Sequence, residues 1–392
     1  MMKPQMAAIW IAKKYGAECV TADGGLTAQG LAHLEAALSS MRAPMPWDCE
    51  MMVTSTEQSL SKAYTMFPIT DPLAWKFYCQ QVAQMWNANE VKFADDRRQF
   101  ASLSPRYREL VGDLLGFFAP GDGLVSMQVL RYIKECTTYA QMMFLIAQLF
   151  IEAVHSEGYG MAIVSLFEDP VEQKAIFDSV DELPCVKAKA AFILKYNNSD
   201  LSAGLRYIAG AASEGVFFVG LFAIIFALRT KGIMKAFVFL NEQVSKDETL
   251  HRDFNAAQAR VLGGFTYEEA VAVLTEAVDI EVAHLSYILR HPLDTAEADA
   301  AMGLTIDNLT LFVKGLADQI LVLAGLPTHF KVSMELPWMR DLALGKKTNF
   351  YEGTVADYKH HSVGTSIDWR TRAGLDDAAP VNAVANPDDV EF

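Results

Sequence analysis

Cysteine is scarce in this sequence, and the few cysteines form no pattern typical of a zinc site or a disulfide framework. Five occur in 392 residues, and no two of them make a Cys-x-x-Cys pair (Cys19, Cys49, Cys79, Cys136 and Cys185). An odd and scattered set is typical of reduced thiols inside the cell. We therefore predict free, mostly buried cysteines in a cytoplasmic protein.

Positive charge is also in short supply. Lys and Arg number 33 against 48 Asp and Glu, which gives a formal net charge of −15. Binding to nucleic acid requires clustered Lys and Arg to neutralise phosphates, so we expect no nucleic-acid partner. A phosphate-binding loop of the GxxxxGK[ST] type is absent too, and we expect no nucleotide substrate to bind to this chain.

No hydrophobic run is long enough to cross a bilayer. The most apolar stretch, residues 215–228 (GVFFVGLFAIIFAL), is shorter than the roughly 20 residues that a transmembrane helix needs. The first residues, MMKPQMAAIWIAKKYG, lack the longer apolar core and the small-residue cleavage site of a secretory signal. We expect neither export nor a membrane partner, and we predict that residues 215–228 form a helix buried on all sides.

Alternating, β-branched segments are almost absent, and apolar residues recur at helical spacing from Pro72 to about Leu344. This pattern predicts an all-α domain over residues 61–358, preceded by an unassigned segment, 1–60. The end, 359–392, is polar, acidic and poor in apolar residues, which predicts a disordered tail. We expect helices at about 72–90, 105–128, 131–158, 159–168, 186–195, 201–229, 232–260, 267–290 and 304–325.

Two segments contain the pattern Glu-x-x-His. They are Glu152–His155 within MMFLIAQLFIEAVHSEGYG and Glu248–His251 within NEQVSKDETLHRDF. Residues three apart share one face of a helix, so each segment can direct a carboxylate and an imidazole at one point. Upstream of each segment lies a single acid in apolar company, Asp122 in FFAPGDGLV and Glu214 in ASEGVFFVG.

These four segments together indicate a two-metal site. Two helices that give one carboxylate each, and two that give Glu-x-x-His, are the ligand set of di-iron and di-manganese carboxylate bundles. Four carboxylates balance two divalent ions, and neutral imidazoles leave that balance unchanged. Without metal, four acids in an apolar interior would repel one another, and some would have to take up protons.

A third match, Glu281–His284, shows that the pattern by itself is weak evidence. It also lies among apolar residues, and nothing in its local spacing excludes it from the ligand set. Single matches of this kind more often mark a solvated helix face than a metal site. The spacing alone therefore leaves the choice among the three pairs open.

At these segments the chain resembles the small subunit of class I ribonucleotide reductase, from about Phe67 to Tyr358 and again at the C-terminal residue. The blocks that carry the resemblance are FPITDPLAW, MWNANEV, FFAPGDGLV, QLFIEAVHSEGYG, SEGVFFVGLFAIIFALRTKGIM, FLNEQVSKDETLHRDF and KKTNFYEGTVADY. The resemblance implies a ferritin-like bundle with additional helices. It also implies six metal ligands, Asp122, Glu152, His155, Glu214, Glu248 and His251, and that Glu281 and His284 are not among them.

The resemblance also implies roles for residues outside the ligand set. Tyr159, four residues after His155, is implied to be the tyrosine oxidised to a stable radical; from the sequence alone it is equally a buried tyrosine hydrogen-bonded to a carboxylate. Trp86 and Asp247 are implied to form, with His155, the inner end of a long-range electron and proton route. Tyr358 is implied to relay between subunits, and the residues implied to form an apolar pocket around the radical are Phe218, Phe222 and Val244.

As partners, the resemblance implies a second copy of the chain in a homodimer and a large catalytic subunit, which docks on the acidic tail ending at Phe392. Two departures stand out: Asp122 and Glu152 are one residue closer than the family pattern, and about 34 residues follow Tyr358. The expected metal is iron, two ions per chain, although manganese accepts the same oxygen and nitrogen donors.

The implied activity is that of ribonucleoside-diphosphate reductase, in which this subunit assembles the metal centre with oxygen and stores a tyrosyl radical. A dimetal oxygenase or desaturase with the same bundle is the alternative. Asp122, where such enzymes usually have Glu, disfavours it, as do Tyr159, Trp86 and the tail. Iron storage of the ferritin type is a further rival, but such chains are much shorter.

Overall fold

The computed structural model describes residues 21, 27–29, 32, 65–332 and 336–339. Within these ranges the chain is helical and contains no strand, which confirms the all-α prediction. The chain divides into two units, 1–336 and 337–392, and the helices below belong to the first. Tyr358, the acidic tail and most of residues 1–60 lie outside the described residues.

The helices follow one another through short connections. In chain order they are α4 (Pro72–Ala83), η2 (Ala88–Glu90, a 3₁₀ turn), α5 (Ala94–Ser102), α6 (Pro105–Glu135), α7 (Tyr139–Leu166), α8 (Pro170–Phe177), α9 (Ser179–Glu182), α10 (Pro184–Asn197), α11 (Ala203–Ala212), η3 (Ser213–Phe218, a π-helix), α12 (Val219–Thr230), α13 (Lys235–Leu262), α14 (Tyr267–Ile288), α15 (Ala296–Met302) and α16 (Ile306–Leu323).

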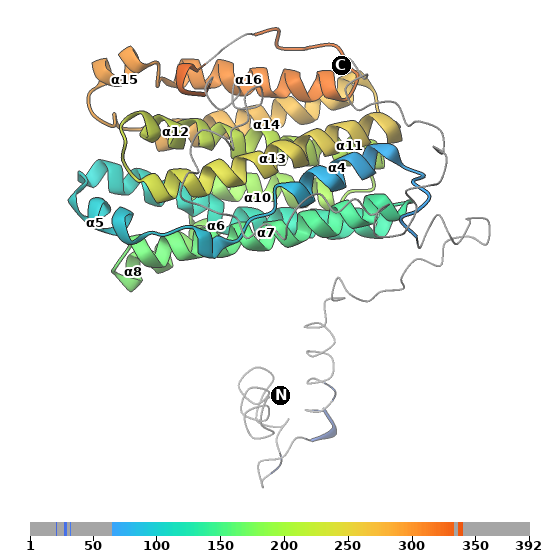
Figure 1. Ribbon diagram of the computed structural model, residues 1–392, viewed down its shortest axis with the longest axis horizontal. Helices are drawn as coiled ribbons and strands as arrows, with labels where there is room; N and C mark the ends of the chain where they lie inside the picture. The colour runs from blue at the N-terminus through green and yellow to red at the C-terminus, as the bar shows by residue number, and fades with distance from the viewer. Residues whose placement is uncertain (1–20, 22–26, 30–31, 33–64, 333–335, 340–392) are drawn as a thin grey trace, which may run out of the picture. The chain divides into compact units, whose positions relative to one another are not determined.

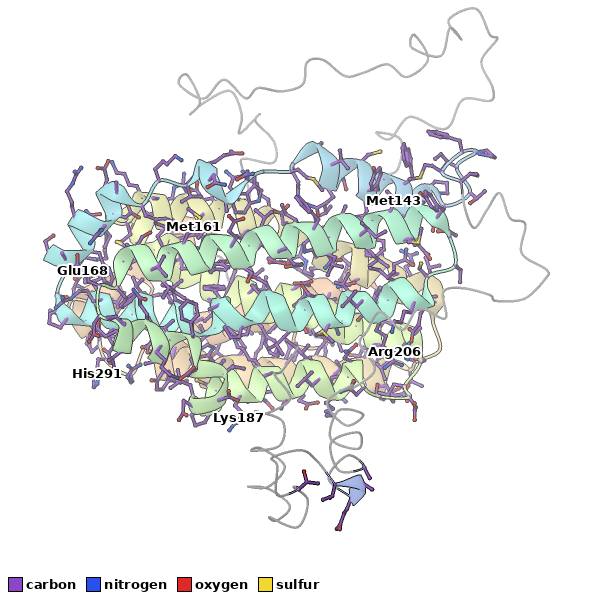
Figure 2. The ribbon with its side chains drawn as sticks, turned by 90° about the horizontal axis from the view of Figure 1, so that it is seen from below. Met143, Met161, Glu168, Lys187, Arg206 and His291 are labelled. Carbon is purple, nitrogen blue, oxygen red and sulfur yellow. The ribbon has the colours of Figure 1, made fainter. Side chains whose placement is uncertain are left out.

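The long helices lie side by side along the long axis of the bundle (Figure 1). α6 packs against α7, α11 against α13, α10 against α14, and α14 against α16. Seen from below, α6 and α7 run along each other, with side chains between them and the helices behind (Figure 2). Their facing sides are apolar, so burial of these sides supplies the main driving force for the bundle.

The predicted break between residues 158 and 159 is wrong, because α7 runs without interruption from Tyr139 to Leu166. Gly158 lies inside this helix for a packing reason: a Cβ there would come within 2.8 Å of Leu240 Cδ1 on α13. Apolar periodicity did not reveal α5, α8, α9 and α15. These are short, so the apolar periodicity that reveals a helix has little length over which to appear.

The connection between α6 and α7 is short and firmly held. Only residues 136–138 separate the two helices, and Thr138 caps α7 by accepting a hydrogen bond from the Gln141 amide, at 3.2 Å. The Thr138 hydroxyl also donates to Asp71 Oδ2 at 3.0 Å, and Asp71 in turn caps α4. The connection that lies between Asp122 and Glu152 therefore ties three helices together.

The apolar run 215–228 is buried along its whole length, as predicted. Two helical stretches are long and apolar enough for a membrane span by composition: residues 203–230, whose apolar window is 100% buried, and Pro105–Glu135, at 56%. Core helices of this kind pass the same test, so the evidence for a span is weak. The prediction of mostly buried cysteines is wrong for those described, because Cys79 is exposed and Cys136 and Cys185 are half-buried.

Candidate metal centre

The structure brings all six predicted metal ligands together in the middle of the bundle. Asp122 comes from α6, Glu214 from η3, and the two Glu-x-x-His pairs come from α7 and α13. None of the six side chains is more than 1% exposed (Asp122, Glu152, His155, Glu214, Glu248 and His251). The donors therefore face one another in an interior from which water is largely excluded.

The six residues form two overlapping groups that could each hold a metal ion. One group contains Asp122 and His155, the other Glu214 and His251, and both contain Glu152 and Glu248. Within each group the candidate donor atoms lie within 4.8 Å of one another. Glu152 and Glu248 could therefore each contribute a donor to both groups.

The Nδ1 atoms of both histidines face this cluster. His155 Nδ1 lies 3.3 Å from Glu152 Oε2 and 3.2 Å from Glu248 Oε1. His251 Nδ1 lies 3.0 Å from Glu152 Oε1 and 3.1 Å from Glu248 Oε2. The two Nε2 atoms point away from the cluster, toward other partners. Nδ1 is therefore the donor that each ring offers to a metal.

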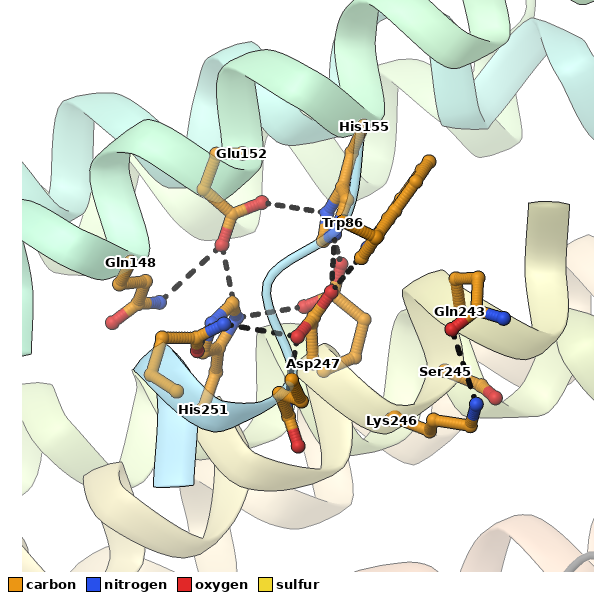
Figure 3. A network of polar contacts seen from close by, with 12 residues as sticks. Trp86, Gln148, Glu152, His155, Gln243, Ser245, Lys246, Asp247 and His251 are labelled. Atoms are coloured by element: carbon orange, nitrogen blue, oxygen red, sulfur yellow. Dashed lines mark hydrogen bonds and ion pairs between the residues drawn. The ribbon is translucent and has the colours of Figure 1, made fainter. Parts of the chain in front are cut away.

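Asp247, which the resemblance placed with His155 and Trp86, lies at the outer nitrogen of His155. His155 Nε2 lies 3.0 Å from Asp247 Oδ2, and the Trp86 indole donates to the same oxygen at 2.9 Å (Figure 3). The indole ring also stacks on the His155 imidazole, with ring centres 5.8 Å apart. The predicted series Trp86, Asp247 and His155 is thus a continuous set of contacts.

Glutamines that the sequence patterns did not indicate also surround the cluster, among them Gln81 and Gln148. Gln81 on α4 donates to Asp247 Oδ1 at 2.9 Å, while its Oε1 lies 2.9 Å from His251 Nε2. Gln148, one turn before Glu152, donates to Glu214 Oε1 at 2.9 Å. The four-residue spacing from Glu152 could have indicated Gln148. Nothing in the sequence around Gln81 indicates its position, because α4 is distant in the chain.

The unsatisfied polar atoms of the cluster fit a pair of cations. Within the described residues, no hydrogen bond reaches either carboxylate oxygen of Asp122, Oε2 of Glu152, Oε2 of Glu214 or Oε1 of Glu248. Buried carboxylate oxygens without partners are costly and uncommon. Oxygen donors with two imidazole nitrogens suit first-row divalent metals. The residues present therefore match the chemistry of a two-metal site.

When no metal is bound, proton uptake offsets the negative charge of the four buried carboxylates. Burial, followed by the charges of neighbouring carboxylates, raises the pKa of Glu214 well above its usual value, and burial does the same for Asp122. Burial opposes protonation of His251, but Glu152 and Glu248 outweigh it and raise its pKa to about 9. Burial likewise opposes ionisation of Glu152, but His251 and His155 lower the pKa of that carboxyl to about 2.

These shifts predict that the metal-free protein loses stability as the pH rises. The raised pKa of His251 gives stability that is complete below about 6.5 and lost as the pH rises through about 9. Protonated Asp122 and Glu214 act in the same direction, because these carboxyls are ionised in the unfolded chain. Each proton held only by the folded state weakens metal-free stability by about 1.4 kcal/mol per pH unit.

Metal binding must displace those protons, so the stabilisation that metal provides should increase with pH. We expect urea-unfolding midpoints between pH 6.5 and 8.5 to fall with pH for metal-free protein, and the gain on adding Mn(II) to rise. His284, whose pKa is lowered by burial and by Lys189, acts in the opposite direction only below about pH 6.5. A metal-free midpoint that rises over this range would contradict the proton assignment.

Tyr159 is fully buried beside the cluster, in an aromatic surrounding. Its ring stacks on Phe118, with centres 4.9 Å apart and planes 9° from parallel. Phe118 in turn contacts the predicted pocket residues Phe218 and Phe222, and Val244 is also buried. Burial, and then the charges of neighbouring carboxylates including Asp122, raise the pKa of the phenol well above 10. The ring therefore lies in a dry, apolar environment within electrostatic reach of the cluster.

The hydrogen-bond partner of Tyr159 is an amide, whereas the sequence suggested a carboxylate. The hydroxyl donates to Asn241 Oδ1 at 3.0 Å, and Asn241 Nδ2 donates to the Phe237 carbonyl at 2.8 Å. Asn241 lies seven residues before Glu248 on α13, two turns away on the same face. That spacing was available in the sequence, but an asparagine in a helix gives no sign of which ring it meets.

The third Glu-x-x-His pair lies elsewhere. Glu281 and His284 on α14 are buried but belong to neither group of candidate donors. Glu281 Oε2 forms an ion pair with Lys189 Nζ at 2.5 Å. Burial, partly offset by Lys189, raises the pKa of Glu281 to about 7. The structure therefore separates this pair from the six residues, although their local patterns are the same.

Comparisons with known proteins identify close parallels. The family model described as ribonucleotide reductase, small chain, matches residues 63–337. The small chain of ribonucleoside-diphosphate reductase from Nicotiana tabacum is 33% identical over 306 residues, covering 78% of this chain and 91% of that protein. Human subunit M2 of the same enzyme is 32% identical over 308 residues, covering 78% and 77%. The solved homodimer of ribonucleotide reductase Rnr4 from Saccharomyces cerevisiae has a TM-score of 0.63 at 26% identity, covering 74% and 90%.

Proposed function

Because this chain belongs to the ribonucleotide reductase small-chain family, we propose that its central cluster holds two metal ions and that Tyr159 is oxidised beside them. The observation that carries the proposal is the sharing of Glu152 and Glu248 by two groups of buried donors. The chain is thus the radical-generating subunit of an oxidoreductase that makes deoxyribonucleotides, and we place it in the cytoplasm.

Each ion would be held by one carboxylate and one histidine of its own, in addition to the two carboxylates that belong to both groups. Asp122 and His155 would hold the first ion, and Glu214 and His251 the second. We propose iron for both positions, and the donor set is equally compatible with manganese. When bound, such a pair supplies, with dioxygen, an oxidant strong enough to take one electron and one proton from an adjacent phenol.

The contribution of the protein at Tyr159 is placement and shielding. One turn of α7 separates Tyr159 from His155, so a rigid helix fixes the phenol relative to the first ion. Phe118 covers one face of the ring, and full burial keeps out water and reductants that would quench a radical. Asn241 holds the hydroxyl through an amide, which is too weak a base to take the proton, so another group must accept the proton on oxidation.

We assign the contacts from Trp86 through Asp247 to His155 to the route by which the oxidising equivalent leaves this subunit. Trp86 is nearly buried and shares Asp247 Oδ2 with the imidazole, so electron and proton movement can be coupled there. In the metal-free protein burial opposes ionisation of Asp247, but His155 outweighs it and keeps the pKa of this carboxyl below its usual value. Tyr358, outside the described residues, is proposed as the relay at the exit.

Two partners are proposed from the related proteins: a second copy of this chain and a large catalytic subunit. The Rnr4 protein, with the same fold, forms a homodimer, and we propose the same for this chain. The large catalytic subunit would bind the acidic C-terminal segment, which ends in Pro387-Asp-Asp-Val-Glu-Phe392. An aromatic residue at the end of an acidic peptide offers both an apolar anchor and charge for a basic groove.

Deleting residues 387–392 is expected to abolish binding to the large subunit and to leave radical formation intact, since no described residue of the metal cluster lies in this segment. Sedimentation with the large subunit of the same organism measures the first, and electron paramagnetic resonance the second. A chain whose last six residues are shuffled keeps length and charge and serves as control. Unchanged complex formation after deletion would rule out docking by the tail.

The proposal as a whole is tested by adding ferrous iron and oxygen to metal-free protein and recording its electron paramagnetic resonance spectrum. Uptake of two ions with a tyrosyl signal is the expected result. If iron is taken up without such a signal, the experiment is repeated with manganese and the protein that activates it. If manganese is also taken up without a signal, the radical role is refuted, and a dimetal oxygenase becomes the better assignment.

A further inference from the structure

A buried ion pair lies outside the metal cluster yet contacts the helix that carries Glu214. Lys189 of α10 and Glu281 of α14 are both 0% exposed, with Nζ and Oε2 2.5 Å apart. Lys189 Nζ also donates a hydrogen bond to the carbonyl oxygen of Phe217, at 3.1 Å. Phe217 belongs to the π-helix η3, three residues after Glu214. The ion pair is thus connected to a proposed metal ligand through one turn of backbone.

The π-helix needs support of this kind. A π-helical turn is wider than an α-helical one, is rare, and disturbs the regular series of backbone hydrogen bonds where it begins and ends. Side-chain donors act at both ends of η3: the hydroxyl of Ser213, its first residue, donates to Ala209 O on α11 at 3.0 Å, and Lys189 donates to Phe217 O near its last residue. Glu214, between them, receives its hydrogen bond from Gln148.

The packing around the ion pair is specific to it. A Cβ at Gly220, two residues beyond η3, would lie 2.3 Å from Glu281 Oε1, so a glycine is required for Glu281 to approach the helix. The Lys189 ammonium lies 4.0 Å from the centre of the Phe117 ring, which adds a cation–π contact. The position of the ammonium is therefore fixed by an acid, a carbonyl and a ring.

Stability alone does not account for a buried pair of charges. Removing two charges from water is costly, and apolar residues of similar volume often serve as well or better in a protein interior. What apolar residues cannot do is donate a hydrogen bond to the Phe217 carbonyl. The function of the pair is therefore to be sought in the geometry of η3.

We propose that Lys189 and Glu281 are positioning residues for Glu214, because they hold the π-helix in the register that directs this carboxylate at the second metal ion. The third Glu-x-x-His match thus supplies an anchor for the ligand-bearing segment rather than a ligand. This inference rests on the proposed function, since it assumes that Glu214 binds metal. It predicts an effect on one ion only, because Glu214 belongs to only one of the two donor groups.

The test is the double variant Lys189→Met/Glu281→Met, which replaces the charges by flexible apolar chains. We expect it to fold with a thermal midpoint close to that of the parent. In a Mn(II) titration of metal-free protein, followed by calorimetry, one ion should bind as in the parent and the other about 10–100-fold more weakly, the range typical of residues that orient ligands. The variant Glu214→Gln should show the same one-ion pattern and serves as reference.

The matched control is Lys195→Met/Glu276→Met. Lys195 and Glu276 form an ion pair between the same two helices, α10 and α14, but at the surface and without contact to η3. This control should bind both ions as the parent does. Hydrogen exchange gives a readout that needs no metal. The backbone amides of residues 214–221 should exchange faster in Lys189→Met/Glu281→Met than in the parent, and at the parental rate in the control.

Three results would overturn the proposal. Parental affinity for both ions would show that Glu214 needs no anchor. Equal weakening of the binding of both ions, or failure of the double variant to fold, would show that Lys189 and Glu281 only support the core. The proposed function fails separately, if the parent protein itself does not take up two ions, and the inference then loses its premise.

Discussion

Replacing Tyr159 by phenylalanine is expected to abolish the tyrosyl radical signal while leaving the uptake of two metal ions unchanged. The substitution removes only the hydroxyl, and that hydroxyl contacts Asn241 and none of the six candidate ligands. The ring can keep its stacking on Phe118. Parallel measurements of bound metal and of the electron paramagnetic resonance spectrum after adding ferrous iron and oxygen separate the two effects.

A modest loss of stability should accompany this change. Asn241 Oδ1 would remain buried without its donor, which costs about 1–3 kcal/mol. Tyr132→Phe is the matched control: Tyr132 is also buried, and its hydroxyl donates to the Arg206 carbonyl at 2.9 Å, away from the candidate ligands. This variant should lose similar stability and keep the signal. A radical that persists in Tyr159→Phe would move the assignment to another tyrosine.

Replacing Glu248 by glutamine should weaken the binding of both metal ions, because this carboxylate belongs to both donor groups. The amide keeps the size of the side chain but removes the negative charge and one good oxygen donor. Since residues that merely orient metal ligands change affinity about 10–100-fold, we expect losses above ~100-fold at each position. Titration of metal-free protein with Mn(II) gives both affinities.

The pattern across variants is more informative than any single loss. Glu214→Gln should affect only the ion near His251, and Asp122→Asn only the ion near His155. Glu242→Gln is the control, because Glu242 lies on the same helix as Glu248 but outside both groups. If Glu248→Gln weakened the binding of one ion alone, Glu248 would not serve both ions, and its assignment to both donor groups would be wrong.

Much of the site could be predicted because its pattern is local. A carboxylate and a histidine three residues apart on a helix share a face whatever the tertiary structure is, so Glu152–His155 and Glu248–His251 stand out in the sequence. The choice against Glu281–His284 could not be made in this way. It depends on Lys189, a residue of another helix, and on the room that Gly220 provides.

The residues that surround the site were missed for a related reason. Gln81, Gln148 and Asn241 act through hydrogen bonds to other helices, and those contacts depend on how far each helix is rotated and shifted in the bundle. Apolar periodicity fixes the buried face of a helix only to within a wide stripe. It does not fix which buried polar atom meets which partner.

The hydrogen bonds beyond the two imidazoles make the two candidate metal positions chemically unequal. In the sequence, the two Glu-x-x-His segments look like equivalent halves of one site. In the structure, the outer nitrogen of His155 faces the carboxylate of Asp247, and that of His251 faces the neutral amide of Gln81. A carboxylate partner makes an imidazole more basic and a stronger electron donor to its metal. An ion held by His155, on the helix that also carries Tyr159, would therefore receive more electron density from its imidazole than an ion held by His251.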